Sequence, residues 1–133
     1  MDEYWDPLRR KNVAATPEEG VRQWFIRELS ETFAVPVQLM NSEVGFNYGS
    51  KRYRADILVW DRSAQPLAIV ECKRPDVEIT PLVAAQALRY DAVLSVRFII
   101  LTNGKSTYVF KRGQDGFKPI SELPDYNQMT CQS

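Results

Sequence analysis

The chain has 133 residues, of which 44% are hydrophobic and 26% are charged, as in one ordinary globular domain. It contains no histidine, which excludes Ser-His-Asp or Cys-His catalysis and zinc binding through histidine. Seventeen basic residues balance seventeen acidic ones, so any attraction to nucleic acid must come from a local basic surface.

Signals for export or membrane insertion are not found. Residues 1–6 are acidic and lack the apolar stretch of a secretory signal. No apolar run approaches the ~20 residues needed to cross a bilayer. The two cysteines, Cys72 and Cys131, are too few for a disulfide framework. We therefore expect a cytoplasmic protein with reduced thiols and no membrane partner.

The first half of the chain predicts a helix and then three strands. Residues 1–15 have mixed charge and no clear period, and we expect a lead-in arm or a short helix there. Thr16-Pro17-Glu18-Glu19 is a helix-start signal, and the apolar spacing after it predicts a helix that ends at Val35-Pro36. Strand formers separated by turn residues predict a three-stranded antiparallel meander over residues 37–48, 53–60 and 67–73.

The second half predicts one more helix and a hairpin. Thr80-Pro81 repeats the helix-start signal, and the helix is expected to reach about Ser95. Residues 96–102 have the composition of a buried strand, and the turn signal Asn103-Gly104 connects it to a final strand at 107–111. The residues that follow are rich in glycine and proline and are expected to be loosely structured, with Ile120 and Leu123 packing back.

The order αβββαββ predicts an α/β (α+β) fold, in which helices flank a mixed sheet. Residues 1–133 are expected to form a single domain. It would consist of an arm at 1–15, a core at 16–112 and a tail at 113–133.

Charged residues interrupt two of the predicted apolar strands. Side chains alternate along a strand, so Glu71 and Lys73 share one face at its end while Cys72 points away. Asp56 lies near the start of the preceding strand. If the loop at 61–66 joins the two strands antiparallel, Asp56 comes close to Glu71 and Lys73.

Two carboxylates with only oxygen ligands suit Mg²⁺, or Mn²⁺ in its place, better than zinc. The backbone carbonyl of Cys72 is a further candidate ligand. Lys73 would orient the attacking water or neutralise charge that develops on a phosphate. The alternative is an ordinary salt-bridged cluster at a strand end.

Both helices offer further candidates. Gln86 and Tyr90 are four residues apart and share a face that we expect to point toward the sheet. They either contact the acidic cluster or are a buried amide and a core tyrosine. In the first helix, Glu18 is expected to point inward and is preferred for the site, whereas Glu19 is expected to point outward and suits a capping box with Thr16.

Five basic residues flank these positions, and each either contacts a phosphate backbone or belongs to a solvated charged face. They are Lys51, Arg52, Arg54, Arg74 and Arg89.

The ordered set of Asp56, Glu71-Cys72-Lys73 and Gln86 to Tyr90 resembles a known signature. It is the D…ExK…QxxxY pattern of type I restriction enzyme R-subunit N-terminal domains, in the PD-(D/E)xK nuclease superfamily. The leading "PD" is Ala55-Asp56 here. Other similar segments are Thr16 to Gln23, Arg54 to Ile57, Val70 to Pro75 and Leu101 to Gly104.

The resemblance implies a restriction-endonuclease-like fold and Mg²⁺-dependent endonuclease cleavage of DNA phosphodiester bonds. By motif position, it implies metal binding by Asp56 and Glu71, a catalytic role for Lys73 and supporting roles for Gln86 and Tyr90. The partners it implies are DNA, other restriction-modification subunits, a helicase motor or a second copy of the chain. RNA as substrate, a catalytically silent nucleic-acid-binding module and a protein-interaction module are the alternatives.

Overall fold

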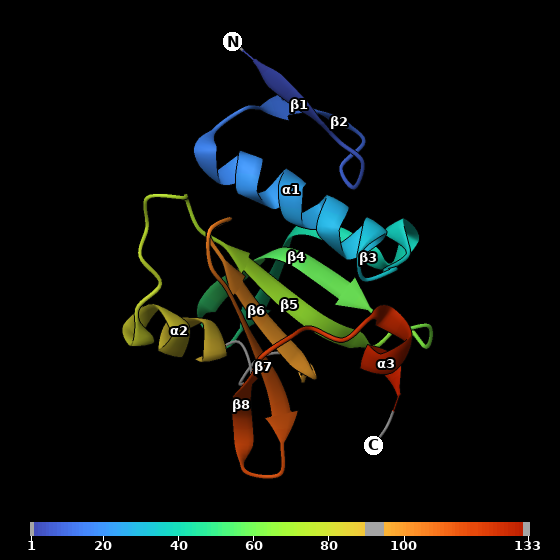
Figure 1. Ribbon diagram of the computed structural model, residues 1–133, viewed down its shortest axis with the longest axis vertical. Coiled ribbons are helices and arrows are strands. Elements are labelled where there is room, and N and C mark those ends of the chain that lie inside the picture. The colour runs from blue at the N-terminus through green and yellow to red at the C-terminus, as the bar shows by residue number, and fades with distance from the viewer. Residues whose placement is uncertain (1, 90–94, 132–133) are drawn as a thin grey trace.

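The computed structural model describes residues 2–89 and 95–131. Its main body is a six-stranded sheet in the order β3-β4-β5-β6-β7-β8, with helices packed around it (Figure 1). These strands are Met40–Tyr48, Lys51–Trp60, Pro66–Cys72, Phe98–Thr102, Thr107–Gly113 and Gly116–Ile120. The helices α1, α2 and α3 are Pro17–Glu31, Pro81–Leu88 and Tyr126–Thr130, and the 3-10 turn η1, Val37–Leu39, precedes β3. Among the described residues, no helix has the length and apolar character needed to span a membrane.

The sheet is mixed, as predicted. β5 and β6 are parallel, whereas all other neighbouring strands are antiparallel. The segment β3-β4-β5 is the predicted meander, and β6-β7 is the predicted hairpin around Asn103-Gly104, where Gly104 has a φ of +88°. A parallel pair needs a crossover connection, and α2 lies in the one between β5 and β6. The predicted order αβββαββ is therefore confirmed from α1 to β7.

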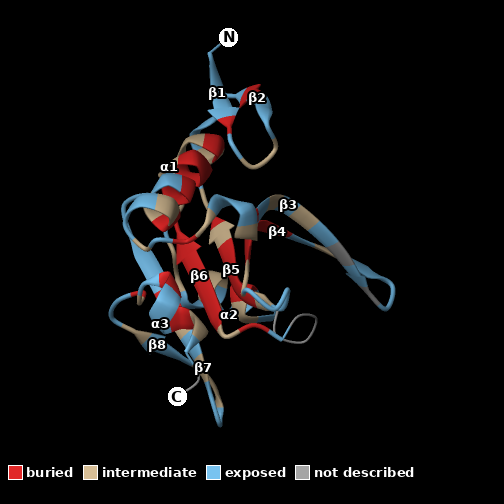
Figure 2. Cartoon of the chain, turned by 90° about the vertical axis from the view of Figure 1, so that its right-hand side faces the viewer, coloured by how far each residue is buried: buried red, intermediate tan, exposed pale blue. Residues whose placement is uncertain are grey.

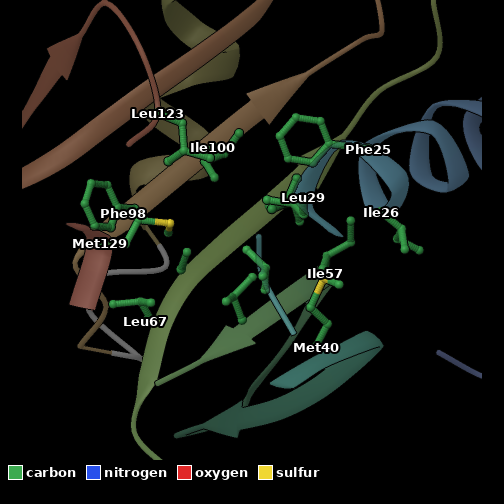
Figure 3. Close-up of a cluster of buried hydrophobic side chains, with 14 of the residues drawn as sticks. Phe25, Ile26, Leu29, Met40, Ile57, Leu67, Phe98, Ile100, Leu123 and Met129 are labelled. Atoms are coloured by element: carbon green, nitrogen blue, oxygen red, sulfur yellow. The ribbon is translucent and has the colours of Figure 1, made fainter. Parts of the chain in front are cut away.

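Two apolar layers cover the two faces of the sheet. In one layer, Ile100 of β6 packs with Phe25 and Leu29 of α1 (Figure 3). In the other, Ile99 of β6 packs with Ala87 of α2. Because the central strands are buried on both faces, their sequences are almost continuously apolar.

The two long helices begin where the sequence predicts. The Thr16 Oγ1 accepts a hydrogen bond of 3.1 Å from the amide of Glu19 at the start of α1, and the Thr80 Oγ1 accepts one of 3.3 Å from the amide of Val83 at the start of α2. These bonds satisfy amides that have no partner within the helix. α2 is described as far as its C-cap Arg89, and the predicted extension toward Ser95 passes through residues 90–94, which lie outside the described residues.

The prediction for residues 1–15 is wrong, because they form a hairpin. β1, Glu3–Asp6, pairs antiparallel with β2, Lys11–Ala14, near the N-terminal end of α1 (Figure 1). The Asp6 carboxylate organises the turn: it accepts a hydrogen bond of 2.8 Å from the amide of Leu8 and another from the Arg9 guanidinium. Both strands are mostly exposed, and their sequences do not alternate between apolar and polar residues.

The prediction of a loosely structured tail is also wrong. β8 pairs with β7 at the sheet edge, where Pro119 is tolerated because an edge strand does not need every amide. α3 follows, and Tyr126 and Met129 are buried in the core. The predicted packing of Leu123 and Ile120 is confirmed, since Leu123 is buried and Ile120 packs against the same core.

Candidate active site

The site begins where β4 and β5 separate. Their last regular pair on this side is Ile57 with Val70. The next residue of β4, Asp56, instead uses its carboxylate: Oδ2 accepts a hydrogen bond of 2.6 Å from the amide of Cys72. The hairpin predicted from the sequence therefore brings Asp56 to Cys72, the last residue of β5, which stands between Glu71 and Lys73 in the sequence.

Glu71 and Lys73 lie on the same side of β5, as strand alternation predicts. Both line a cleft of about 350 Å³, and the Lys73 Nζ is 3.9 Å from the Glu71 Oε1. The Lys73 amide donates a hydrogen bond of 2.8 Å to the carbonyl of Thr102, which ties this end of β5 to β6. Cys72 is buried in the opposite apolar layer.

Asp56 is buried and does not line the cleft. Its burial raises the pKa of the carboxyl above the usual value, and the charge of Glu18 adds to this rise. The hydrogen bond from Cys72 and the charges of Arg22 and Lys73 act in the opposite direction. Ionisation of Asp56 is therefore opposed mainly by its burial.

The Cys72 thiol has no nucleophilic role at neutral pH. Burial raises the pKa of this thiol well above its usual value, and the charges of Asp56 and Glu71 raise it further. The thiol therefore stays protonated, whereas a nucleophilic cysteine must be a thiolate.

Arg22 of α1 is the central residue that the sequence analysis missed. Its side chain is only 5% exposed, and its guanidinium lies between four carboxylates. The shortest N–O distances are 3.2 Å to Glu43, 3.5 Å to Asp56, 3.6 Å to Glu19 and 3.9 Å to Glu18. The arginine in an otherwise apolar helix face was the available signal, since a buried charge requires partners.

Arg22 also connects Asp56 to the N-terminal hairpin. Glu19 and Glu43, which it contacts, are both paired with Arg9 of the β1–β2 turn, at 2.7 and 3.2 Å. Arg9 is in turn held by Asp6. A continuous network of ion pairs therefore runs from the hairpin to the candidate site.

The predicted orientations of Glu18 and Glu19 are wrong. The Glu18 side chain is 45% exposed, whereas that of Glu19 is 9% exposed. The Glu19 carboxylate accepts hydrogen bonds from Arg9 and Gln23, so only the Thr16 half of the capping box forms. The helical wheel assumed packing against the sheet alone, but the hairpin covers a second side of α1. Glu18 nevertheless lies within 3.9 Å of Arg22, at the edge of the same cluster.

The expectation that Gln86 points toward the sheet is wrong as well. Gln86 is exposed, and Ala87 is the residue of α2 buried against the sheet. Gln86 does line the cleft that contains Glu71 and Lys73. Tyr90 lies outside the described residues.

Two of the five basic candidates, Lys51 and Arg89, line this cleft. Arg52 and Arg54 are exposed on β4. Arg74 is exposed and forms an ion pair of 3.3 Å with Asp76, as expected for a solvated charged face.

Comparisons with known proteins concern the fold and the sequence family. No curated protein matches the chain. A family model described as "Type I restriction enzyme R protein N terminus (HSDR_N)" matches residues 17–124. A fragment of a candidate HsdR subunit of a type I restriction enzyme from Vibrio vulnificus YJ016 has a TM-score of 0.64 and 19% identity. The match covers 88% of this chain but only 25% of that one, so the chain spans about a quarter of its length.

A second similar structure is a candidate nuclease of the DUF820 group from Anabaena variabilis ATCC 29413. It has a TM-score of 0.52 and 11% identity, and the match covers 85% of this chain and 72% of that one. The protein therefore has a fold found in a restriction-enzyme subunit and in a candidate nuclease. Because the family model covers most of the sequence, the chain belongs to the family of type I restriction enzyme R protein N-terminal domains.

Proposed function

We propose that this domain is a Mg²⁺-dependent endonuclease that hydrolyses DNA phosphodiester bonds. The observation that supports this most is the 2.6 Å hydrogen bond from Cys72 to Asp56. It holds a buried carboxylate at the end of the strand that presents Glu71 and Lys73 to an open cleft. Carboxylates and an ammonium group at one end of a sheet provide what phosphoryl hydrolysis requires: a cation site and a positive charge for the phosphate.

The carboxylate oxygens of Asp56 and Glu71 are ligands of the type that a magnesium ion prefers, and Mg²⁺ typically uses one or two carboxylates and keeps several waters. Asp56 and Glu71 would hold the ion, with the Cys72 carbonyl as a third protein ligand, and Mn²⁺ would substitute. When bound, the ion supplies Lewis acidity toward the phosphate and the attacking water.

The side chains of the cleft would perform the remaining steps. Lys73 donates a hydrogen bond that orients the water for in-line attack, and its charge stabilises the negative charge developing on the phosphate. Gln86 contacts a phosphate oxygen from the opposite wall of the cleft. Arg22 is a positioning residue that compensates the charge of Asp56, and Glu18 acts only through Arg22. Tyr90 is assigned a role next to Gln86 by the sequence motif alone.

Family membership supports a proposal about partners. Besides DNA, we propose that the domain works with other restriction-modification subunits or a helicase motor, or as a homodimer. The proposed location is the cytoplasm, where such partners and DNA are found together.

One observation favours a second candidate function, a catalytically silent module that binds nucleic acid or protein. Among the residues described in the structure, no three His, Cys, Asp or Glu side chains gather into a metal-binding group. If the cation site is too weak to be occupied, the fold would still present the cleft and its basic residues.

Plasmid cleavage distinguishes the two candidates. Wild-type protein is incubated with supercoiled plasmid in Mg²⁺ or Mn²⁺, beside Lys73→Ala and the control Lys118→Ala, which alters an exposed residue of the distant strand β8. We expect cleavage by the wild type and Lys118→Ala only. In calorimetry, Mn²⁺ binding is expected for the wild type and not for Asp56→Asn. Equal cleavage by wild type and Lys73→Ala, together with no Mn²⁺ binding, would favour the silent module.

A further inference from the structure

The β1–β2 hairpin reaches the site through the side chain of Arg9. Figure 2 shows this hairpin at the outer end of α1, with most of both strands exposed. The Arg9 side chain in its turn is only 18% exposed and is held in place by the carboxylate of Asp6. Arg9 lies outside residues 17–124, where the chain matches the family, so family membership gives it no role.

Two carboxylates join Arg9 to Arg22, and each gives one oxygen to each arginine. The Glu19 Oε1 is 2.7 Å from the Arg9 guanidinium, and its Oε2 is 3.6 Å from that of Arg22. The Glu43 Oε2 is 3.2 Å from Arg9, and its Oε1 is 3.2 Å from Arg22. The four side chains therefore form a closed ring, in which the position of each arginine depends on the other.

The backbone of Glu43 has a conformation that glutamate rarely adopts. Its φ of +53° lies in the left-handed region, which is unfavourable for a residue with a Cβ atom. The strand register on either side places Glu43 opposite Asp56 of β4. Burial opposes the ionised form of Glu43, but the hydrogen bond and charge of Arg22 and the charge of Arg9 act against it, and the pKa is lowered. The two arginines thus stabilise an ionised carboxylate in a strained position beside Asp56.

The ring leaves the Nη2 of Arg22 turned toward Asp56. The Nη1 and Nε atoms face Glu43 and Glu19, and Nη2 is 3.5 Å from the Asp56 Oδ1. The other oxygen, Oδ2, accepts the hydrogen bond from the Cys72 amide. The direction of this carboxylate is therefore fixed from two sides, by the backbone of β5 and by Arg22.

The contact between Arg22 and Asp56 is the easier of the two to lose. Its length of 3.5 Å is beyond the usual range of a hydrogen bond, and Glu43 lies closer to Arg22, at 3.2 Å. If Arg9 is removed, the charge of Glu43 is no longer shared between two arginines. Because attraction between opposite charges grows as their distance falls, Arg22 would then move toward Glu43 and away from Asp56.

We propose that Arg9 is a positioning residue for Asp56. It shares the charge of the two glutamates, which keeps Arg22 in contact with the Asp56 carboxylate and keeps that carboxylate in the orientation that binds a cation. The hairpin thereby sets the affinity of the site for a divalent cation. The effect on the cation, but not the positioning of Asp56, rests on the proposed nuclease function.

A cycle of single and double variants in EDTA tests the positioning without a metal. Arg9→Lys keeps the charge but lacks the planar fork that gives separate N–H groups to several carboxylates. Urea unfolding is measured for the wild type, Arg9→Lys, Asp56→Asn and the double variant. The control cycle uses Arg10→Lys, which alters an exposed arginine of the same turn. Circular dichroism checks that each variant is folded.

We expect Arg9→Lys to raise the unfolding equilibrium constant at least about threefold more in the wild type than in Asp56→Asn, as for other coupled sites. The reason is that Asp56→Asn has already removed the carboxylate that Arg22 would lose. Long-range attraction between Arg9 and Asp56 does not account for such a difference, because Arg9→Lys keeps the charge. Arg10→Lys should act equally in both backgrounds. Equal effects of Arg9→Lys in both would overturn the inference.

Calorimetry with Mn²⁺ gives the second measurement. Arg9→Lys should weaken Mn²⁺ binding at least about fivefold, less than the loss of about 10–100-fold that is typical for a direct partner of a metal ligand, because Arg9 acts through Arg22. Arg10→Lys should bind Mn²⁺ as the wild type does. Unchanged affinity in Arg9→Lys would also overturn the inference. If the wild type binds no Mn²⁺, the nuclease proposal fails, and the unfolding cycle in EDTA alone decides the role of Arg9.

Discussion

Replacing Arg22 by methionine tests whether its charge holds the acidic cluster together. Methionine keeps most of the apolar length of the side chain but removes the guanidinium. Glu18 and Glu43 are partly exposed and can be hydrated, and Glu19 retains its 2.7 Å bond to Arg9. Asp56 loses its arginine partner while it stays buried. Breaking one buried ion pair typically costs about 3–5 kcal/mol, a large part of the ~5–15 kcal/mol that stabilises a domain.

Urea unfolding in EDTA measures this loss. We expect Arg22→Met to lower the free energy of unfolding by about 3 kcal/mol or more, with the slope m unchanged. The control Arg27→Met alters an exposed arginine of the same helix, and we expect it to stay within about 0.5 kcal/mol of the wild type. The double variant Arg22→Met/Asp56→Asn should recover much of the loss, because asparagine leaves no buried charge.

Two results would refute the role assigned to Arg22. One is a loss below about 1 kcal/mol, which is typical of an exposed ion pair. The other is a loss of stability that Asp56→Asn does not relieve. Such a result would mean that the loss comes from packing or from the other carboxylates.

Three further predictions concern the site and the hairpin. Asp56→Asn should raise the free energy of unfolding at pH 7 without divalent ions. Burial raises the folded-state pKa of Asp56, so the ionised carboxylate destabilises the folded protein. The gain in stability should therefore shrink as the pH falls toward 3.8. Urea unfolding from pH 4 to 8 measures it, and a gain independent of pH would contradict this cause. In Asp6, burial opposes the charged form, but hydrogen bonds from Arg9 and Leu8 outweigh it and lower the pKa. The contribution of the ionised Asp6 to stability is therefore complete above the usual pKa of 3.8 and is lost as the pH falls through the lower folded-state value. In that low-pH range, amide exchange in β1–β2 should accelerate before exchange in β5. Simultaneous acceleration in both places would contradict the role assigned to Asp6. Finally, Lys73→Ala should reduce cleavage in Mg²⁺ at least about 100-fold while Mn²⁺ binding persists, and cleavage rates with calorimetry would show whether the two effects separate.

The sequence by itself determined most of the order of elements and the family. Thr16-Pro17 and Thr80-Pro81 begin helices because the threonine hydroxyl caps the first turn and the proline ring suits the first helical position, and both effects are local. Asn103-Gly104 makes its turn for an equally local reason. Strand alternation placed Glu71 and Lys73 on one side of β5, since successive side chains point to opposite faces in any strand.

Only the tertiary structure decided which charges are buried. Glu19 is buried because the β1–β2 hairpin covers the side of α1 that a helical wheel assigns to solvent. Arg22 is enclosed by carboxylates from both α1 and the sheet, and no local pattern specifies such a meeting. α3 spans only five residues, too few for a stable isolated helix, and it is held by contacts such as the 2.7 Å bond from the Tyr126 hydroxyl to the carbonyl of Trp60. These features depend on contacts between residues that are far apart in sequence. Such contacts stabilise the protein only after the chain has folded.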